Sequence, residues 1–218
     1  MSWWHGETMP LTQFDGIVYI NLKRRPDRRA SLMQVLEKLR VDFAKVHRIE
    51  AVDDPLNGTR GCLLSHIQAL DLIQNKGWER GLILEDDVIF HCTIDEIKRV
   101  TESFFEDFKG NWDVLMLGGA YLEVYYTFKE SIFRIREADR AHAYVVHPDY
   151  LPILKECFHQ ARDIMKDHVF FQESFPYAVD ASWKPLQQKD RWFGPKERFF
   201  NQSEGVSDIE HAVKLFRH

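Results

Sequence analysis

The chain has 218 residues, of which 44% are hydrophobic and 29% charged, and its formal net charge is −5. This composition is ordinary for a globular protein, and the length suffices for one substantial domain or two small ones. No basic run is dense enough to suggest nucleic-acid binding, and no segment approaches the roughly 20 apolar residues of a membrane span. The first residues also lack the charged start and apolar core of a signal peptide.

The cysteines Cys62, Cys92 and Cys157 are odd in number and share no spacing typical of a metal site. This pattern indicates reduced, buried thiols rather than a disulfide framework. We therefore expect a cytoplasmic protein.

The chain begins with an expected irregular lead-in over residues 1–16. Residues 17–22 are β-branched and aromatic, which predicts a first strand. Proline suits the first turn of a helix, and apolar residues then recur at helical spacing, so a helix is expected over 26–40. Residues 43–49 are predicted to form a second strand and residues 53–58 a turn.

A second helix is expected to open at Gly61 and to stop at Gly77. Residues 81–90 then form a strand interrupted by acids, residues 93–108 a helix with a capping box, and residues 112–117 a buried strand. This rhythm of strands and helices predicts an α/β fold with a mainly parallel sheet that helices cover on both faces.

The second half is less regular. Residues 121–136 alternate aromatic and polar side chains, as in a hairpin, and residues 143–146 are typical of a strand. A helix is expected to start at Pro148. Residues 177–180 lead into a short helix that Asp180 is expected to cap.

The acidic stretch Glu85-Asp86-Asp87 lies between two apolar runs. Unpaired carboxylates are too costly inside a buried strand, so the acids mark the carboxyl edge of a sheet, where open α/β sheets bind ligands. Adjacent carboxylates repel one another unless a cation lies between them, and oxygen ligands suit Mg²⁺ or Mn²⁺. Such an ion could hold a diphosphate. The alternative is a solvated acidic turn without a metal.

Several motifs follow one another in a specific order over about residues 17–210. They are Tyr19-Ile20-Asn21-Leu22 with the arginine-rich segment 24–29, Gly61-Cys62-Leu63-Leu64-Ser65-His66, Leu84-Glu85-Asp86-Asp87-Val88, Trp112-Asp113 through Leu117-Gly118, His142-Ala143-Tyr144, Val179-Asp180, and Gln202 with Ser207-Asp208-Ile209. Together they resemble glycosyltransferase family 25, which includes bacterial lipooligosaccharide galactosyltransferases and procollagen galactosyltransferases. Ala143 stands where that family usually has glycine.

The resemblance implies a GT-A fold: a single catalytic domain over 17–218, with a Rossmann-like nucleotide-binding half at about 17–120 and an acceptor half at about 121–210. It also implies transfer of a hexose, galactose or glucose, from a UDP-sugar, usually with Mn²⁺ (or Mg²⁺) and with inversion. The acceptor would be a glycan, a lipooligosaccharide or a hydroxylysine-containing protein. The short chain without secretory features favours a bacterial or viral protein that is cytoplasmic, at most peripheral to a membrane.

In GT-A enzymes an acidic motif at a strand end holds the metal. By this resemblance Glu85 and Asp87 are the expected metal ligands, and Glu85 or Asp86 would contact the ribose or a metal-bound water. The ion would neutralise the leaving diphosphate. For Asp86 the alternative is a cap or turn hydrogen bond.

Donor-binding candidates lie after the first strand and on the second helix. Asn21, Arg24 and Arg28 follow the strand, and arginine donates to phosphate in a planar fork; the alternative is a solvated basic helix face. Ser65 and His66 are expected in the first turns of a helix, whose N-terminus favours anions. The alternative for His66 is a packing role.

An inverting transfer needs a base for the acceptor hydroxyl, and Asp180 is our candidate. The alternative is a helix cap. His142 could help to bind the metal or diphosphate, and Gly118 is grouped with the donor-binding residues by the resemblance.

Three aromatics, Trp183, Trp192 and Tyr125, could form a platform for a sugar ring, although core packing is the alternative. Two other functions compete with active transfer. One is an inactive GT-A-like carbohydrate-binding or scaffold domain. The other is a sugar-phosphate nucleotidyltransferase, which would want a glycine that residues 23–26 lack.

Overall fold

The computed structural model describes residues 11–169, 171–203, 205–206, 209 and 213–214. Its centre is an eight-stranded sheet with the order β2-β1-β3-β8-β5-β9-β7-β6. Three neighbouring strands are parallel: β1 (Gly16–Asn21), β2 (Val46–Glu50) and β3 (Gly81–Glu85). Their short β-branched and apolar runs are what a strand buried between two layers of helices requires.

The rest of the sheet comes from the second half of the chain. Its strands are β5 (Val114–Met116), β6 (Ala120–Tyr126), β7 (Ile132–Asp139), β8 (Ala143–Val146) and β9 (Trp192–Pro195). β8 lies antiparallel between β3 and β5, and β7 lies antiparallel between β9 and β6, so the other strands share one direction. The predicted α/β fold with a mainly parallel central sheet is confirmed, and so is the hairpin, formed by β6 and β7.

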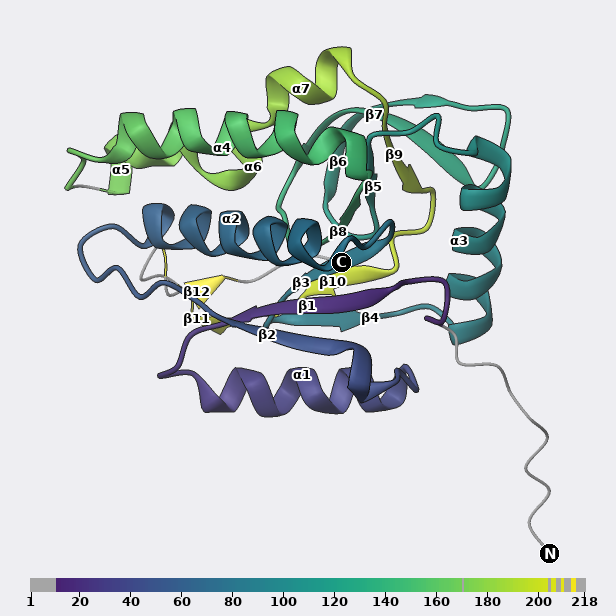
Figure 1. Cartoon of the computed structure of the whole chain (residues 1–218), viewed down its shortest axis with the longest axis horizontal. Helices are drawn as coiled ribbons and strands as arrows, with labels where there is room; N and C mark the ends of the chain where they lie inside the picture. Colours follow the sequence, from purple (N-terminus) through teal and green to yellow (C-terminus); the bar gives the residue numbers. More distant parts are fainter. Residues whose placement is uncertain (1–10, 170, 204, 207–208, 210–212, 215–218) are drawn as a thin grey trace, which may run out of the picture.

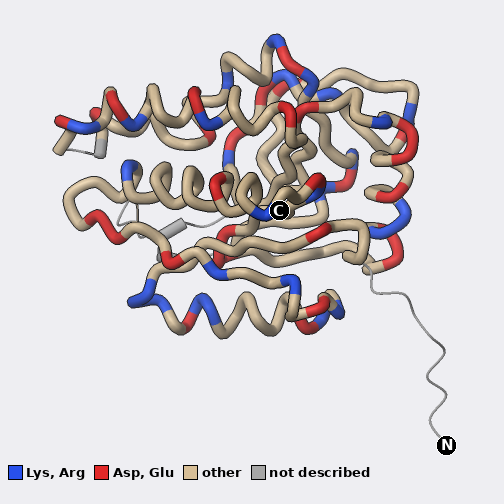
Figure 2. Tube along the Cα trace, viewed as in Figure 1, with Lys and Arg blue, Asp and Glu red and all other residues tan. Residues whose placement is uncertain are grey.

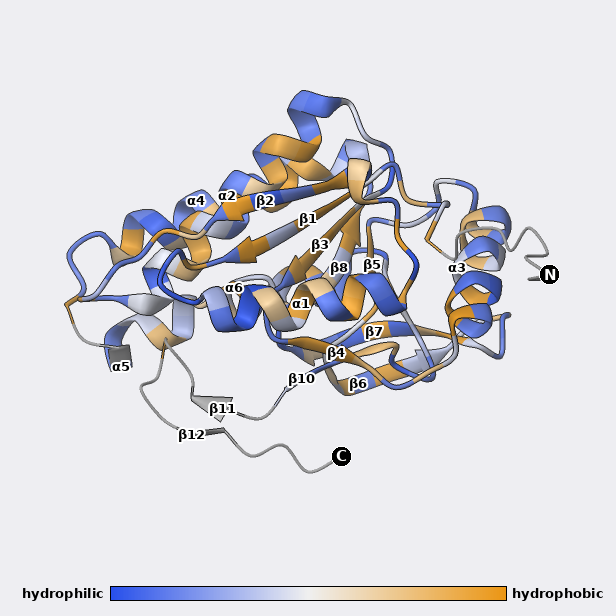
Figure 3. Ribbon diagram, turned by 90° about the horizontal axis from the view of Figure 1, so that it is seen from below, coloured by the Kyte–Doolittle hydropathy of each residue, from blue (hydrophilic) through white to orange (hydrophobic). Residues whose placement is uncertain are grey.

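Helices cover both faces of this sheet (Figure 1). α1 (Pro26–Lys38) packs on one face, while α2 (Gly58–Lys76) and α4 (Leu151–Met165) pack side by side on the other. Figure 3 shows the largely hydrophobic central strands between these layers. On β3, Leu82 and Leu84 join the core with α1 and α3 (Ile94–Phe108), whereas Ile83 joins the core with α2 and α4. This alternation is the period of two that a strand imposes.

Short elements complete the chain. β4 (Val88–Phe90) pairs antiparallel with β10 (Phe200–Gln202), and β11 (Gly205–Val206) pairs with β12 (Val213–Lys214). The short helical segments are η1 (Phe43–Lys45), η2 (Pro148–Tyr150), α5 (Phe171–Ser174), η3 (Phe175–Tyr177), α6 (Val179–Ser182) and α7 (Lys184–Lys189).

The capping box and the helix stop were predicted correctly. Thr93 accepts a hydrogen bond from the backbone N–H of Glu96, and Gly77 ends α2 in the left-handed conformation. The start of the second helix was wrong, because Asn57 accepts from the backbone N–H of Arg60 and so begins α2 at Gly58 rather than at Gly61. Asp180 was also wrong as a cap, since Ala178 precedes α6 and Asp180 lies in its first turn.

Lys and Arg are interspersed with Asp and Glu along the described trace (Figure 2). Among the described helices, none combines the length and the apolar character that crossing a membrane would require. The predicted Ser207-Asp208 motif lies outside the described residues, as do residues 1–10 of the expected lead-in.

Candidate functional site

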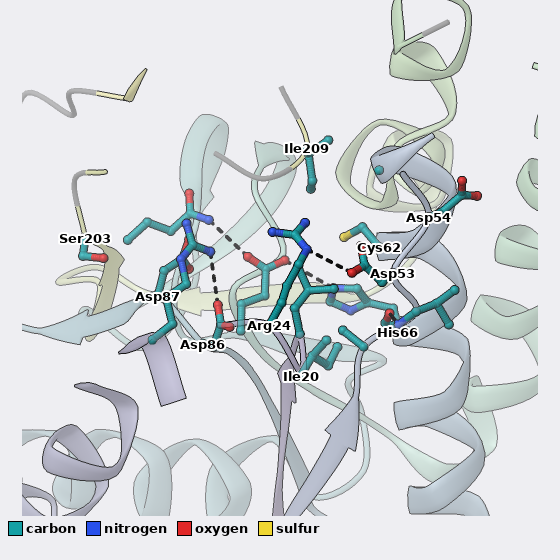
Figure 4. Close-up of a pocket in the computed structure, with 18 residues that line it drawn as sticks. Ile20, Arg24, Asp53, Asp54, Cys62, His66, Asp86, Asp87, Ser203 and Ile209 are labelled. Atoms are coloured by element: carbon teal, nitrogen blue, oxygen red, sulfur yellow. Dashed lines mark hydrogen bonds and ion pairs between the residues drawn. The ribbon is translucent and has the colours of Figure 1, made fainter. Parts of the chain in front are cut away.

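A pocket opens at the carboxyl ends of β1 and β3, where Ile20 pairs with Glu85 (Figure 4). Its walls come from the segment after β1, the segment before α2, one side of α2, the acidic turn after β3, and the segment after β10. The lining residues that matter here are Arg24, Arg28, Val52, Asp53, Cys62, Ser65, His66, Glu85, Asp86, Asp87 and Gln202. The acidic stretch therefore lies at the carboxyl edge of the sheet, as the sequence predicted.

Glu85 is held between two nitrogen atoms. Its Oε1 lies 3.2 Å from His66 Nε2, and its Oε2 accepts a hydrogen bond from Gln202 Nε2 at 3.1 Å. Burial raises the pKa of Glu85, but the hydrogen bond and charge of His66, with the charges of His142 and Arg28, hold the pKa below its usual value. Glu85 is thus an oriented carboxylate, charged at neutral pH.

Asp86 turns away from Glu85. Its Oδ2 accepts from Asn21 Nδ2 at 2.7 Å, and its Oδ1 lies 3.2 Å from an Arg28 nitrogen. Burial raises the pKa of Asp86, although Asn21 and Arg28 lower it in part. Asn21 also donates to the backbone oxygen of Arg25 at 3.0 Å. The turn hydrogen bond that was the alternative for Asp86 is therefore present, and it ties the acidic turn to the turn after β1.

Asp87 has a different environment. One oxygen, Oδ2, lies 3.5 Å from Arg28, while the other, Oδ1, is buried without a hydrogen-bond partner among the described residues. Burial and the charge of Glu85 raise the pKa of Asp87 to about 7, against the lowering effect of Arg28. A buried acceptor oxygen beside a second carboxylate suits a hard cation such as Mn²⁺ or Mg²⁺. Glu85 and Asp87 consequently fit the metal that the resemblance implies.

Two arginines line the same pocket. Arg28 lies between Asp86 and Asp87, and Arg24 Nε donates to Asp53 Oδ2 at 2.9 Å. The Arg24 side chain is 47% exposed, so it can exchange this surface ion pair for a ligand at little cost. Carboxylates for a cation and guanidinium groups for phosphate oxygens therefore meet in one pocket.

Ser65 and His66 lie about two turns inside α2, so the prediction that they sit in its first turns is wrong. Ser65 Oγ donates to the Gly61 carbonyl at 2.7 Å and accepts from the Val52 backbone N–H at 2.9 Å, which fixes the pocket wall that precedes α2. His66 is fully buried, with Nδ1 2.9 Å from the Tyr144 hydroxyl. His66 thus connects Tyr144 to Glu85.

Gly118 and His142 lie behind the pocket and do not line it. His142 Nε2 is 3.0 Å from the Phe200 carbonyl oxygen, and burial lowers the pKa of His142. A Cβ on Gly118 would come within 2.3 Å of His142 Nε2 and 2.7 Å of the Phe200 oxygen. The absence of a side chain at Gly118 therefore allows β10, and with it Gln202, to approach the site.

Asp180 does not line the pocket either. Its Oδ2 accepts a hydrogen bond from the backbone N–H of Arg140 at 2.7 Å, and Arg140 has a left-handed φ of 71°. Burial raises the pKa of Asp180, and the charges of Asp139 and Glu85 raise it further. A carboxylate whose pKa lies above the usual range is a stronger proton acceptor, as a general base requires.

The aromatic platform is wrong for two of its three residues. Trp183 and Trp192 are fully buried and pack edge to face in the core, with ring centroids 5.0 Å apart. Tyr125 is 56% exposed on β6.

Among the pocket residues that were not predicted as site residues, Gln202 and Cys62 lie closest to the chemistry, since both approach Glu85. Gln202 belongs to one of the motifs that resemble the family, but no local sequence pattern predicts its contact with Glu85. Cys62 precedes His66 by four residues, which places both on one face of α2. This spacing is visible in the sequence and is the local signal that points to the pair.

Known proteins share the segment that builds most of this pocket. The model of the family described as "Glycosyltransferase family 25 (LPS biosynthesis protein)" matches residues 51–144. Procollagen galactosyltransferase 1-B of Xenopus laevis is 30% identical over 138 residues, which are 51% of this chain and 22% of that protein. Inactive glycosyltransferase 25 family member 3 of Mus musculus is 30% identical over 132 residues, 48% of this chain and 22% of that protein.

A crystal structure of mannose-1-phosphate geranyltransferase from Thermus thermophilus aligns with a TM-score of 0.49 and 10% identity, over 85% of this chain and 75% of that one. The matching segments span about a fifth of the length of the curated relatives. The family match covers the wall before α2, the helix that carries His66, and the acidic turn. The resemblance that the motifs predicted is thereby confirmed: over residues 51–144 the chain is similar to glycosyltransferase family 25.

Proposed function

We propose that this chain is a metal-dependent, inverting glycosyltransferase that moves a hexose from a UDP-sugar to a glycan or hydroxylated protein acceptor. The observation that carries the proposal is the buried Oδ1 of Asp87, which has no hydrogen-bond partner in the described part of the chain; Asp87 lies with Glu85 in a pocket that Arg24 and Arg28 also line. Carboxylate oxygens beside guanidinium groups suit a cation together with a diphosphate.

Each group has a distinct part in this mechanism. Glu85 and Asp87 would hold the divalent ion, which when bound neutralises charge on the leaving diphosphate. Arg24 and Arg28 would donate hydrogen bonds to phosphate oxygens. Asp180 would take the proton from the acceptor hydroxyl, and its raised pKa matches that task.

The printed names of the family and of its members suggest the first substrates to try. The Xenopus laevis relative is named a procollagen galactosyltransferase, which supports UDP-galactose as donor and a hydroxylysine peptide as acceptor. The family description names LPS biosynthesis, which supports a lipooligosaccharide core as the other acceptor. UDP-glucose belongs in the same panel, because a pocket discriminates poorly between sugars that differ at one hydroxyl unless it hydrogen-bonds that hydroxyl.

The experiment measures UDP release and product formation by the purified chain with UDP-galactose and UDP-glucose, with and without Mn²⁺, for each acceptor. We expect turnover that needs Mn²⁺ and that Asp87→Asn abolishes without loss of the folded state. Asp163→Asn is the matched control, because Asp163 is exposed on α4 and pairs only with its neighbour Arg162 in the described structure. Full turnover by Asp87→Asn would refute the assignment.

A catalytically inactive domain is the second candidate. It is favoured by the internal hydrogen bonds of Asp86 with Asn21 and Arg28, and by relatives that are named as inactive or probably inactive. An inactive domain would bind UDP with Mn²⁺, seen as thermal stabilisation, yet release no UDP from any donor in the panel.

A further inference from the structure

Three side chains of different chemistry, those of Cys62, His66 and Glu85, line the pocket, and Figure 4 labels Cys62 and His66 there. The ligand atoms of Cys62, His66 and Glu85 all lie within 4.8 Å of one another. Cys62 and His66 are one helical turn apart on α2, and Glu85 ends β3 beside them. A thiol, an imidazole and a carboxylate are the ligand types that structural and catalytic zinc sites use.

The spacing matches a tetrahedral ion. For Zn²⁺ bonds of about 2.0–2.1 Å to nitrogen and 2.0–2.2 Å to oxygen, the two ligand atoms would be roughly 3.3–3.5 Å apart. His66 Nε2 and Glu85 Oε1 are 3.2 Å apart. The distance between these two atoms therefore already suits a shared ion, and binding requires each side chain to turn toward the ion without moving apart from the other.

Neighbouring residues hold both ligands in place. The Tyr144 hydroxyl contacts His66 Nδ1 at 2.9 Å, which leaves Nε2 directed at Glu85, and Gln202 holds the other oxygen of Glu85 at 3.1 Å. Partners of this kind fix the orientation of ligating side chains in metal sites. All three ligands line the pocket, so a fourth coordination position would face solvent or substrate.

We propose that Cys62, His66 and Glu85 form a site for a thiophilic divalent cation, with Zn²⁺ as its natural ion. On binding, the Cys62 thiol loses its proton to solvent, and the thiolate, imidazole and carboxylate each donate one electron pair to the ion. Thiolate and imidazole ligands select Zn²⁺ and Co²⁺ over the harder Mn²⁺. This site differs from the proposed oxygen-ligand pair Glu85 and Asp87, and the two sites have Glu85 in common.

The shared carboxylate has a regulatory consequence, which rests on the proposed function. An ion bound by Cys62 and His66 would also bind Glu85, which could then no longer bind Mn²⁺ together with Asp87. Zn²⁺ would therefore inhibit Mn²⁺-dependent turnover. Binding of the soft ion itself does not depend on that function.

The test uses Co²⁺ as a spectroscopic probe of the metal-free full chain, because a cobalt–thiolate bond gives an intense near-ultraviolet charge-transfer band. We expect one band that saturates at one equivalent, persists in a Cys92→Ser/Cys157→Ser double variant, and is lost in Cys62→Ser. Added Zn²⁺ should bleach the band stoichiometrically. Gln202→Ala should weaken Co²⁺ binding by about 10-fold, since it releases one side of Glu85.

Absence of a thiolate band in the wild-type chain at saturating Co²⁺ would overturn the proposal, as would a band that survives in Cys62→Ser. The double variant retains Cys62 as its single cysteine, so the test does not depend on whether Cys62→Ser folds. A cobalt band without hexose transfer would uphold this site while the proposed function fails. Mn²⁺-dependent transfer without a cobalt band would give the reverse result.

Discussion

Gln202 donates a hydrogen bond from Nε2 to Oε2 of Glu85 at 3.1 Å, across 117 positions of the sequence. Antiparallel pairing of β10 with β4 sets Gln202 opposite Val88, just beyond the acidic turn. Glu85 is thereby held from the side opposite His66. A strand near the end of the described chain completes a site whose acids come from its first half.

Replacing Gln202 by alanine should weaken UDP binding in the presence of Mn²⁺ by about 10-fold, because a hydrogen bond to a charged group contributes roughly 1.5–3 kcal/mol. Isothermal titration calorimetry measures this change. Gln160→Ala is the control, since Gln160 is exposed on α4 and bonds only to Glu156 in the described structure. Equal UDP affinity in both variants would mean that Gln202 does not orient the ligand.

Asp87 should make the stability of the metal-free protein depend on pH. Its pKa is about 7 in the folded state and near the ordinary value of 3.8 in the unfolded state. The folded state therefore holds a proton that the unfolded state has released, so stability falls as pH rises from about 4 to 7 and is level above that. Asp86 and Asp180, whose pKa values are also raised, act in the same direction.

Asp87→Asn removes the loss of stability that ionisation of the buried Asp87 carboxyl causes at high pH. At pH 8 with a chelator, we expect the variant to be at least about 1 kcal/mol more stable than the wild type, which is about 2–4 °C in Tm for a chain of this size. At pH 5 the difference should shrink. Thermal melts between pH 5 and 8 test this, and a variant that melts below the wild type at pH 8 would contradict it.

The acidic edge of the sheet could be predicted because its signal is local. Apolar runs on both sides of Glu85-Asp86-Asp87 are compatible with a strand, and the cost of buried charge places the acids at its end. The sequence around the start of α2, in contrast, does not distinguish a helix start from a turn. Asn57 and Gly58 are as typical of a turn as of a helix start, because an asparagine side chain accepts from a following backbone N–H in both.

The partners of these acids depend on long-range register and could not be read from local patterns. Asp86 meets Asn21 because β1 and β3 are parallel neighbours with Ile20 opposite Glu85. Trp183 shows the same limit, since nothing in its own sequence context distinguishes a core tryptophan from one that contacts a sugar.

Gly118→Ala should lower both stability and UDP affinity. The new Cβ would lie 2.7 Å from the Phe200 backbone oxygen, so β10 must shift and carry Gln202 with it. Overpacking of this kind costs about 1–3 kcal/mol. The matched comparison is Gly77→Ala, where φ is +63° and, apart from its chain neighbours and its own helix backbone, no described atom lies within 4 Å of the new Cβ.

Gly77→Ala should cost roughly 1–2 kcal/mol through its left-handed backbone alone and leave UDP affinity unchanged. Thermal melts and UDP titrations on both variants measure the two effects separately. If Gly118→Ala loses stability but binds UDP as tightly as Gly77→Ala does, β10 does not position the site.

Asp180→Asn tests the proposed base without disturbing its surroundings. The amide oxygen of asparagine can still accept the backbone N–H of Arg140, a contact of 2.7 Å in the wild type, but asparagine cannot take a proton. We therefore expect kcat to fall by about 10²-fold or more while UDP affinity stays within about 3-fold, as for loss of general-base catalysis.

Asp163→Asn is the control, because Asp163 is exposed on α4 and pairs only with its neighbour Arg162 in the described structure. The wild-type kcat should rise with pH through the raised pKa of Asp180, above the usual range of an aspartate, because only the ionised carboxylate accepts the proton. In Asp180→Asn that rising limb should disappear. Equal losses of kcat and UDP affinity, with the pH profile unchanged, would instead assign Asp180 the structural task of holding the turn at Arg140.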